Sequence, residues 1–182
     1  MEKLHIEREK VGRLIGKDGR NKKKIEQELG VRLKVSSSGI VTIQGDVQYA
    51  HYAVKVIQAF CFGFELGDAL LLGDPECRFE VINIKNYAKS KNRLREVKGR
   101  LIGTQGRVKR VLEELGDVVL CVSENKLGII GKTEEVVMVR EAIDSLLKGA
   151  KQSRIYRWLE KGQRHFRRVE DVEDRGNEYR EE

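Results

Sequence analysis

A nine-residue string occurs twice in this chain, and the repeat limits the folds that the chain can adopt. GRLIGKDGR at residues 12–20 returns as GRLIGTQGR at residues 99–107, with changes only at the two positions between the last two glycines. Behind each copy, the pattern of apolar residues predicts a basic helix, two short strands and another amphipathic helix. A whole small domain is therefore duplicated, and a length of 182 residues suits two such domains.

The charge of the chain is unevenly distributed. Lys and Arg total 36 against 29 Asp and Glu, and the formal net charge is +7. Residues 170–182 nevertheless hold seven acidic and two basic residues, so the rest of the chain is strongly basic. A basic surface attracts phosphates because each cation that neutralises one releases condensed counterions. A mixed-charge surface of the thermophile kind is the alternative, and the segregation of sign disfavours it.

Composition excludes several classes of site. Cys61, Cys77 and Cys121 lack Cys-x-x-Cys spacing, and the three histidines lie in separate segments, so we expect neither a disulfide framework nor a metal site. The beginning of the chain has no apolar segment of signal-peptide type, and no apolar run reaches membrane-spanning length. We therefore expect a cytoplasmic protein without a cofactor, without a membrane partner and without a catalytic constellation.

The order of predicted elements is β-α-α-β-β-α in both halves. The first half is expected to have a strand around Leu4, helices at 11–15 and 20–29, strands at 31–35 and 40–43, and a helix capped by Asp46. The second half is expected to have a strand at 79–84, helices at 99–102 and 107–115, strands at 118–122 and 127–130, and a helix at 133–147. Gly30 and Gly116 are predicted to end the second helix of each half. An extra basic segment at 85–95, either a loop or a helical extension, distinguishes the second half.

These elements predict an α+β protein in which each domain is a three-stranded sheet packed by helices. The expected boundaries are a first domain at 1–62, a helical connector at 63–77, a second domain at 78–150, a basic amphipathic C-terminal helix at 151–168 and an acidic disordered tail at 169–182. For that helix, docking of Trp158 on the second domain is the plainer interpretation. Contact of its basic stripe with RNA and attachment to a membrane surface are the alternatives.

Each Gly-x-x-Gly turn is the candidate binding site. A residue without Cβ lets the chain turn sharply and lets a phosphodiester backbone approach closely, at the start of a helix whose free N–H groups favour anions. Bases would lie in an aliphatic groove that also includes Leu33 and Val35, or Val119 and Cys121. The candidate RNA-binding residues are Arg13, Leu14, Ile15, Gly16, Lys17, Asp18, Gly19, Arg20, Lys22 and Lys23 in the first copy, and Arg100, Leu101, Ile102, Gly103, Thr104, Gln105, Gly106, Arg107, Lys109 and Arg110 in the second.

Two Gly-x-x-Gly turns inside a β-α-α-β-β-α order indicate tandem type I KH domains, which bind single-stranded RNA. A lone Gly-x-x-Gly would more often be a simple helix cap. The first copy also resembles the phosphate-binding Walker loop, but it is one residue too short and has Asp18 where a magnesium-binding hydroxyl is required. The aromatic content of 6% disfavours an RRM.

Beyond the two turns, the joining segment GFELGDALLL at 63–72, the string IIG at 129–131 and the closing segment GAKQSRIYRWLE at 149–160 carry a family resemblance. The chain resembles archaeal two-KH-domain proteins of the partner-of-Nob (Dim/Pno-type) and KRR ribosome-assembly family. The resemblance implies non-catalytic binding of small-subunit ribosomal RNA near its 3′ end, with a Nob-type nuclease and the alpha subunit of initiation factor two as partners. A general KH protein of messenger RNA turnover or translation initiation is the alternative.

Overall fold

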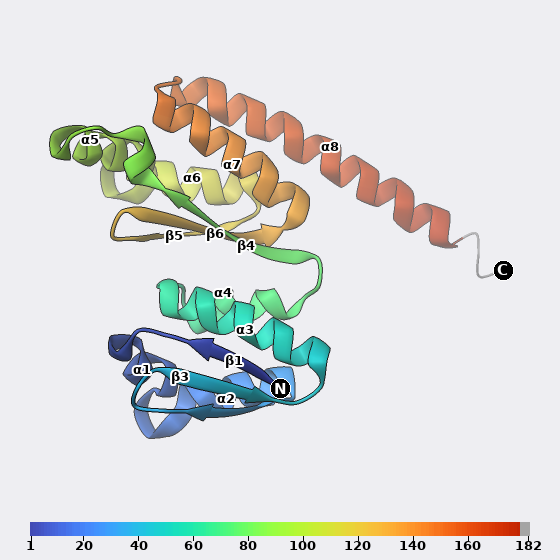
Figure 1. Ribbon diagram of the computed structural model, residues 1–182. Coiled ribbons are helices and arrows are strands. Elements are labelled where there is room, and N and C mark those ends of the chain that lie inside the picture. The colour runs from blue at the N-terminus through green and yellow to red at the C-terminus, as the bar shows by residue number, and fades with distance from the viewer. Residues whose placement is uncertain (179–182) are drawn as a thin grey trace. The chain divides into compact units, whose positions relative to one another are not determined.

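The computed structural model describes the backbone of residues 1–178 and the side chains of residues 1–166 (Figure 1). The first repeat consists of β1 (Glu2–His5), α1 (Arg8–Ile15), α2 (Arg20–Leu29), β2 (Arg32–Val35), β3 (Ile40–Gln44) and α3 (Val47–Phe62). The second consists of β4 (Cys77–Asn83), α5 (Lys91–Ile102), α6 (Arg107–Gly116), β5 (Val119–Ser123), β6 (Lys126–Lys132) and α7 (Thr133–Lys148). The short helix α4 (Leu66–Leu70) lies between the repeats, and α8 (Gln152–Glu178) follows the second.

Both sheets are three-stranded and antiparallel, with the last strand of each repeat in the middle. The strand orders are β1-β3-β2 and β4-β6-β5. Leu4 pairs with Val41 and Leu33 with Ile43 in the first sheet, while Phe79 and Val119 both pair with Ile130 in the second. The predicted fold class, two α+β domains of β-α-α-β-β-α order followed by a C-terminal helix, is confirmed.

Contacts between residues divide the chain into two compact units. The first unit comprises Met1–Asn83 with Val119–Thr133, and the second comprises Ile84–Val118 with Glu134–Glu182. The first unit therefore includes the strands of the second sheet, a division that differs from the boundaries between the repeats.

The core of the first unit lies under the helices of the first repeat. Leu14, Ile25, Leu33, Ile43 and Ile57 are almost wholly buried there. The connector belongs to the same core, because Phe64 and Leu72 are buried within it.

Phe62 at the end of α3, Phe64 of the connector and Phe79 of β4 form an aromatic cluster, with ring centroids 5.6–5.9 Å apart. A β-carbon on Gly128 would lie 2.6 Å from the Phe64 ring, so this glycine of β6 makes room for the aromatic cluster.

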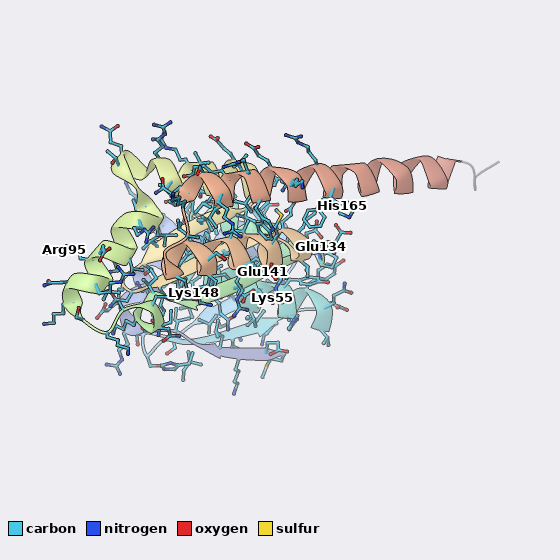
Figure 2. The ribbon with its side chains drawn as sticks, turned by 90° about the horizontal axis from the view of Figure 1, so that it is seen from above. Lys55, Arg95, Glu134, Glu141, Lys148 and His165 are labelled. Carbon is cyan, nitrogen blue, oxygen red and sulfur yellow. The ribbon has the colours of Figure 1, made fainter. Side chains whose placement is uncertain are left out.

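The second unit is held together by close helix contacts. A β-carbon added to Gly162 of α8 would lie 2.2 Å from Met138 Sδ on α7. α8 also contacts α6. Figure 2 shows α8, which carries His165, beside α7, which carries Glu141 and Lys148.

Three predicted boundaries are corrected. The extra basic segment forms a 3-10 turn at Ile84–Tyr87 and the first turns of α5, which begins at Lys91 rather than at Gly99. Ser90 caps this helix by accepting a hydrogen bond of 3.2 Å from the backbone N–H of Arg93. The sequence signal for this helix start was Ser90, a residue type favoured at helix N-caps, followed by a segment without Gly or Pro. Tyr87 donates a 2.8 Å hydrogen bond to Asp144, which anchors the segment on α7.

Gly116 does not cap α6, because the left-handed capping residue is Asp117, with φ 51°. Gly116 is instead buried, and a β-carbon there would lie 2.2 Å from Val139 Cγ2. Close packing of α6 on α7 therefore explains this glycine.

The acidic segment that begins at residue 169 was predicted to be disordered, but α8 continues to Glu178. No proline interrupts the sequence between Gln152 and Glu178. The rest of the predicted tail, residues 179–182, lies outside the described residues.

Over residues 1–178, no helix has both the length and the apolar character that crossing a bilayer requires. Within the same part of the chain, no three His, Cys, Asp or Glu residues come together in a way that could hold a metal ion.

Candidate nucleic-acid interface

The two Gly-x-x-Gly turns have nearly the same backbone conformation. Gly16 and Gly103 have φ 71° and 72°, with ψ 176° and 175°. Gly19 and Gly106 have φ 75° and 74°, in the left-handed region that favours glycine. Each turn lies between the first and second helices of its repeat, at an offset of 87 residues. The repeat in the sequence is therefore a repeat in local structure.

The first glycine of each turn is required by packing. A β-carbon on Gly16 would lie 2.7 Å from Asn21 Nδ2, and one on Gly103 would lie 2.4 Å from Val108 Cγ2. Asn21 is itself held in place, since its Nδ2 donates to the carbonyl oxygen of Arg13 at 2.8 Å. Any side chain at either glycine would displace the helix that follows the turn.

The second glycine of each turn has free space in front of it. A β-carbon on Gly106 would meet no atom within 4 Å, and one on Gly19 would meet only Lys23 Cε at 3.9 Å. The residues between the glycines, Lys17 with Asp18 and Thr104 with Gln105, are exposed. A polyanion could therefore approach the backbone of the turn without displacing any part of the protein.

Cations lie in the turn and the first turn of the following helix. Lys17, Arg20 and Lys23 are exposed at the first site, and Arg107 and Arg110 are exposed at the second. Arg110 also donates a 3.0 Å hydrogen bond to the carbonyl oxygen of Gln105, which links the helix to the turn. The structure thus brings together the positive charges that the sequence predicted at each site.

Two of the predicted cations are engaged elsewhere. Lys22 lies 3.8 Å from Glu26, and Lys109, its counterpart, lies 2.7 Å from Glu113. Glu26 also accepts a 2.7 Å hydrogen bond from the backbone N–H of Leu33, so this carboxylate joins α2 to β2. Lys22 and Lys109 are therefore each paired with a carboxylate of their own helix, and their contact with a phosphate stays a prediction.

Arg13 and Arg100 were predicted to bind RNA, and their hydrogen bonds indicate a different role. Arg13 donates to the carbonyl oxygens of Gly63 at 3.2 Å and Phe64 at 2.7 Å, and its guanidinium lies 4.8 Å from the centre of the Phe60 ring. Carbonyls at the end of a helix lack partners within the helix, and a cation there is favourable. Arg13 therefore closes the end of α3, and its contact with a phosphate stays a prediction.

Arg100 makes the equivalent contacts in the second repeat. It donates to the carbonyl oxygens of Gly149 at 3.3 Å and Ala150 at 3.4 Å, just after α7. Arg100 therefore closes the end of α7, and its contact with RNA also stays a prediction. The charge pattern alone does not distinguish these two arginines from the other cations of each site.

The predicted aliphatic groove is also corrected. Leu14, Leu33 and Leu101 are buried in the core, so they support the turns from behind and do not offer a surface to bases. Ile15 and Ile102 remain partly exposed and are still candidates for contact.

Val119 and Cys121 lie on the wrong face of β5. They pack against the hydrophobic cluster of the first unit, whereas Leu33 and Val35 correspond to Leu120 and Val122 at the 87-residue offset. Because side chains alternate along a strand, an error of one residue moves the whole set to the opposite face.

A pocket of about 630 Å³ adjoins the second turn and includes residues that sequence reasoning missed. Gly103, Thr104 and Arg107 form one wall, and Gln152 and Tyr156 of α8 belong to the same lining. Desolvation raises the pKa of Tyr156, opposed by the nearby positive charge of Arg107. The sequence held no signal for this pocket, because its walls are separated by about 50 residues.

Comparison with known proteins agrees with this geometry. Residues 78–164 match the model of a eukaryotic type KH domain (KH-domain type I) of the PNO1 second-domain class, and residues 1–59 match the model of a KH domain. A KH domain-containing protein of Methanocaldococcus jannaschii, MJ0443, is 40% identical over 93% of this chain and 77% of its own length.

Two further relatives have more specific names. The pre-rRNA-processing protein pno1 of Emericella nidulans is 28% identical, and the match covers 74% of this chain and 55% of that protein. A solved a/eIF2alpha–aDim2p–rRNA complex from Pyrococcus horikoshii contains a chain with a TM-score of 0.79 and 28% identity, over 90% of this chain and 94% of that one. With two Gly-x-x-Gly turns in two type I domains, the chain belongs to the KH-domain family of the PNO1/Dim2 type.

Proposed function

We propose that this protein binds single-stranded ribosomal RNA of the small subunit near its 3′ end and acts, without catalysing a reaction, in rRNA processing and ribosome assembly. The observation that carries the proposal is the pair of turns with matching dihedral angles, each with open space at its second glycine and exposed cations beside it. The names of the relatives, a pre-rRNA-processing protein and an rRNA-bound aDim2p, support ribosomal RNA as the ligand.

Each turn would act as a clamp on the sugar–phosphate backbone. The α2 and α6 helices begin directly after Gly19 and Gly106, so their unpaired N–H groups and positive dipole ends face the incoming phosphate. Lys17, Arg20 and Arg107 add Coulomb attraction from the surface. These contacts recognise the backbone and carry no base specificity by themselves.

Two protein partners belong to the same proposal. The solved complex of aDim2p contains a/eIF2alpha as well as rRNA, which supports the alpha subunit of initiation factor two as a partner of this chain. A Nob-type nuclease is proposed as a second partner from the family resemblance.

Sequencing the RNA that crosslinks to this protein in cells tests the proposal. We expect enrichment at the 3′ end of the small-subunit rRNA and its precursor, and loss of that enrichment when Thr104 and Gln105 are both replaced by Asp. A matched control carries two Asp substitutions at exposed positions of α3, Val47→Asp and Gln58→Asp. Enrichment spread over messenger RNAs would instead support a general role in messenger RNA turnover or translation initiation.

A further inference from the structure

The pocket beside the second turn combines the clamp with a surface from α8. Gly103 and Thr104 come from the turn, and Arg107 begins α6. Gln152 and Tyr156 stand one helical turn apart at the start of α8, and both line the same pocket. An RNA strand held by the second turn would therefore have this pocket immediately beside it.

The lining has the chemistry that a nucleotide requires. Tyr156 offers an aromatic ring, on which any base can stack, and Arg107 supplies a positive charge near it. The amide of Gln152 and the carboxylate of Glu96 offer a donor and acceptors for the edge of a base, and Glu96 keeps acceptor capacity beyond its 2.8 Å ion pair with Arg93. The volume of about 630 Å³ falls within the range of about 300–1,000 Å³ that is typical of sites for small ligands.

The pocket has a fixed wall because α8 is held at two points. Arg100, which also lines the pocket, hydrogen-bonds the carbonyl oxygens of Gly149 and Ala150 just before α8 begins. Further along, Gly162 lets α8 approach Met138 closely. Tyr156 lies between these points, so its position is set before any ligand binds.

The first repeat has no equivalent of this aromatic wall. The residue 87 positions before Tyr156 is Ala69, which is buried, and the residue 87 positions before Gln152 is Glu65. The two clamps are alike in backbone, but only the second is followed in sequence by a helix that carries a tyrosine at this place. The difference between the repeats therefore lies in the neighbouring pocket.

We propose that the pocket formed by Tyr156, Gln152, Glu96 and Arg107 binds the base of a nucleotide adjacent to those held by the second Gly-x-x-Gly turn. The proposal rests on the proposed RNA-binding function and deepens it, because it extends the RNA contact of the second domain onto α8. Binding there would make the second domain favour longer single strands and would let Gln152 and Glu96 discriminate between bases.

Fluorescence anisotropy with single-stranded RNA of two lengths tests this subsite. The probes are labelled pools of random sequence, one of four nucleotides, the length that a KH turn clamps, and one of eight. We expect Tyr156→Ala to weaken binding of the eight-nucleotide pool about tenfold and to leave the four-nucleotide pool unchanged, because a stacked base is lost. Tyr156→Phe, which keeps the ring, should bind both pools like the unchanged protein.

Trp158→Ala is the matched control, since it removes an exposed aromatic side chain from the same helix outside this pocket. An unchanged affinity of Tyr156→Ala for the eight-nucleotide pool would overturn the subsite. The clamp is tested separately by Thr104→Asp with Gln105→Asp combined with Lys17→Asp, and full binding by that variant would overturn the proposed function itself.

A second measurement keeps the inference testable if Tyr156→Ala does not fold. RNA of eight nucleotides that contains 4-thiouridine is crosslinked to the unchanged protein, and the crosslinked peptides are identified by mass spectrometry. A crosslink to the peptide that contains Gln152 and Tyr156 supports the subsite. Crosslinks confined to other peptides contradict it.

Discussion

The guanidinium of Arg13 donates a hydrogen bond of 2.7 Å to the carbonyl oxygen of Phe64, just beyond the end of α3. In the second repeat, Arg100 donates to the carbonyl oxygens of Gly149 and Ala150 just beyond the end of α7. The arginine of the repeated string therefore joins the first helix of each repeat to the end of the third. It holds the helix before each clamp in place.

Replacing Arg13 by Gln should affect stability more than RNA binding. We expect the free energy of unfolding to fall by about 1 kcal/mol, because the carbonyl oxygens lose a charged donor at a partly solvated site. The slope of log affinity against log salt should stay unchanged, since the guanidinium is already bound to the carbonyl oxygens of Gly63 and Phe64. Chemical denaturation and anisotropy titrations at several salt concentrations measure the two quantities, and a salt slope smaller by about 0.7 would instead make Arg13 a phosphate ligand.

The two glycines of each turn should respond differently to alanine. Gly103→Ala should destabilise the protein strongly, because its β-carbon would lie 2.4 Å from Val108 Cγ2. Gly106→Ala should cost only about 1–2 kcal/mol of left-handed backbone strain, yet it should weaken RNA binding because its methyl group lies where the phosphates approach. Thermal unfolding and anisotropy titrations test this pair. Equal losses of stability would contradict a packing role for Gly103 that Gly106 does not share.

The packing of α8 against α7 should contribute to stability through the close contact at Gly162. Gly162→Ala should lower the free energy of unfolding, because the added methyl group would lie 2.2 Å from Met138 Sδ. Met138→Ala should also destabilise, since it removes a buried side chain, but the double variant should be more stable than the sum of the two losses predicts. A double-mutant cycle by denaturation measures the coupling, and strict additivity would argue against contact at this point.

Cys61 should be a slow nucleophile in the folded protein. Burial raises the pKa of its thiol from 9.0 to about 11, opposed by the positive charges of Arg13 and Lys10. Between pH 9 and 11 the thiol is therefore ionised in the unfolded chain while it remains protonated in the folded one, so stability is lost as pH rises through that range. Alkylation by iodoacetamide at pH 9, followed by mass spectrometry of the Cys61 peptide, should be much slower without guanidinium than with it.

The repeat was sufficient to predict the fold because local signals agreed with one another. Asp46 caps α3 by accepting a 2.9 Å hydrogen bond from the backbone N–H of Gln48, and Gly30 ends α2 in the left-handed conformation, both as predicted. Where local signals had two explanations, the prediction failed. Gly116 resembles a helix cap, but its lack of a side chain serves the packing of α6 against Val139.

The roles of individual site residues were harder to predict because they depend on distant partners. A free cation and a helix-capping arginine look alike in sequence, and only the carbonyl oxygen of Phe64, 51 residues away, distinguishes Arg13. The face of β5 depends on which side the connector covers, so Val119 and Cys121 could not be assigned from alternation alone. Tyr156 joins the second turn only through the path of α8.

Both turns are proposed to clamp the RNA backbone, and negative charge introduced at the turns tests that clamp. Lys17→Asp combined with Thr104→Asp and Gln105→Asp places carboxylates at exposed positions, and Asp18 shows that an aspartate tolerates the φ of about 55° that this turn requires. Circular dichroism should show an unchanged fold, and fluorescence anisotropy with single-stranded RNA should show no binding. The control, Val47→Asp with Gln58→Asp, should bind RNA normally. Unchanged affinity of the triple variant for RNA would contradict the clamp.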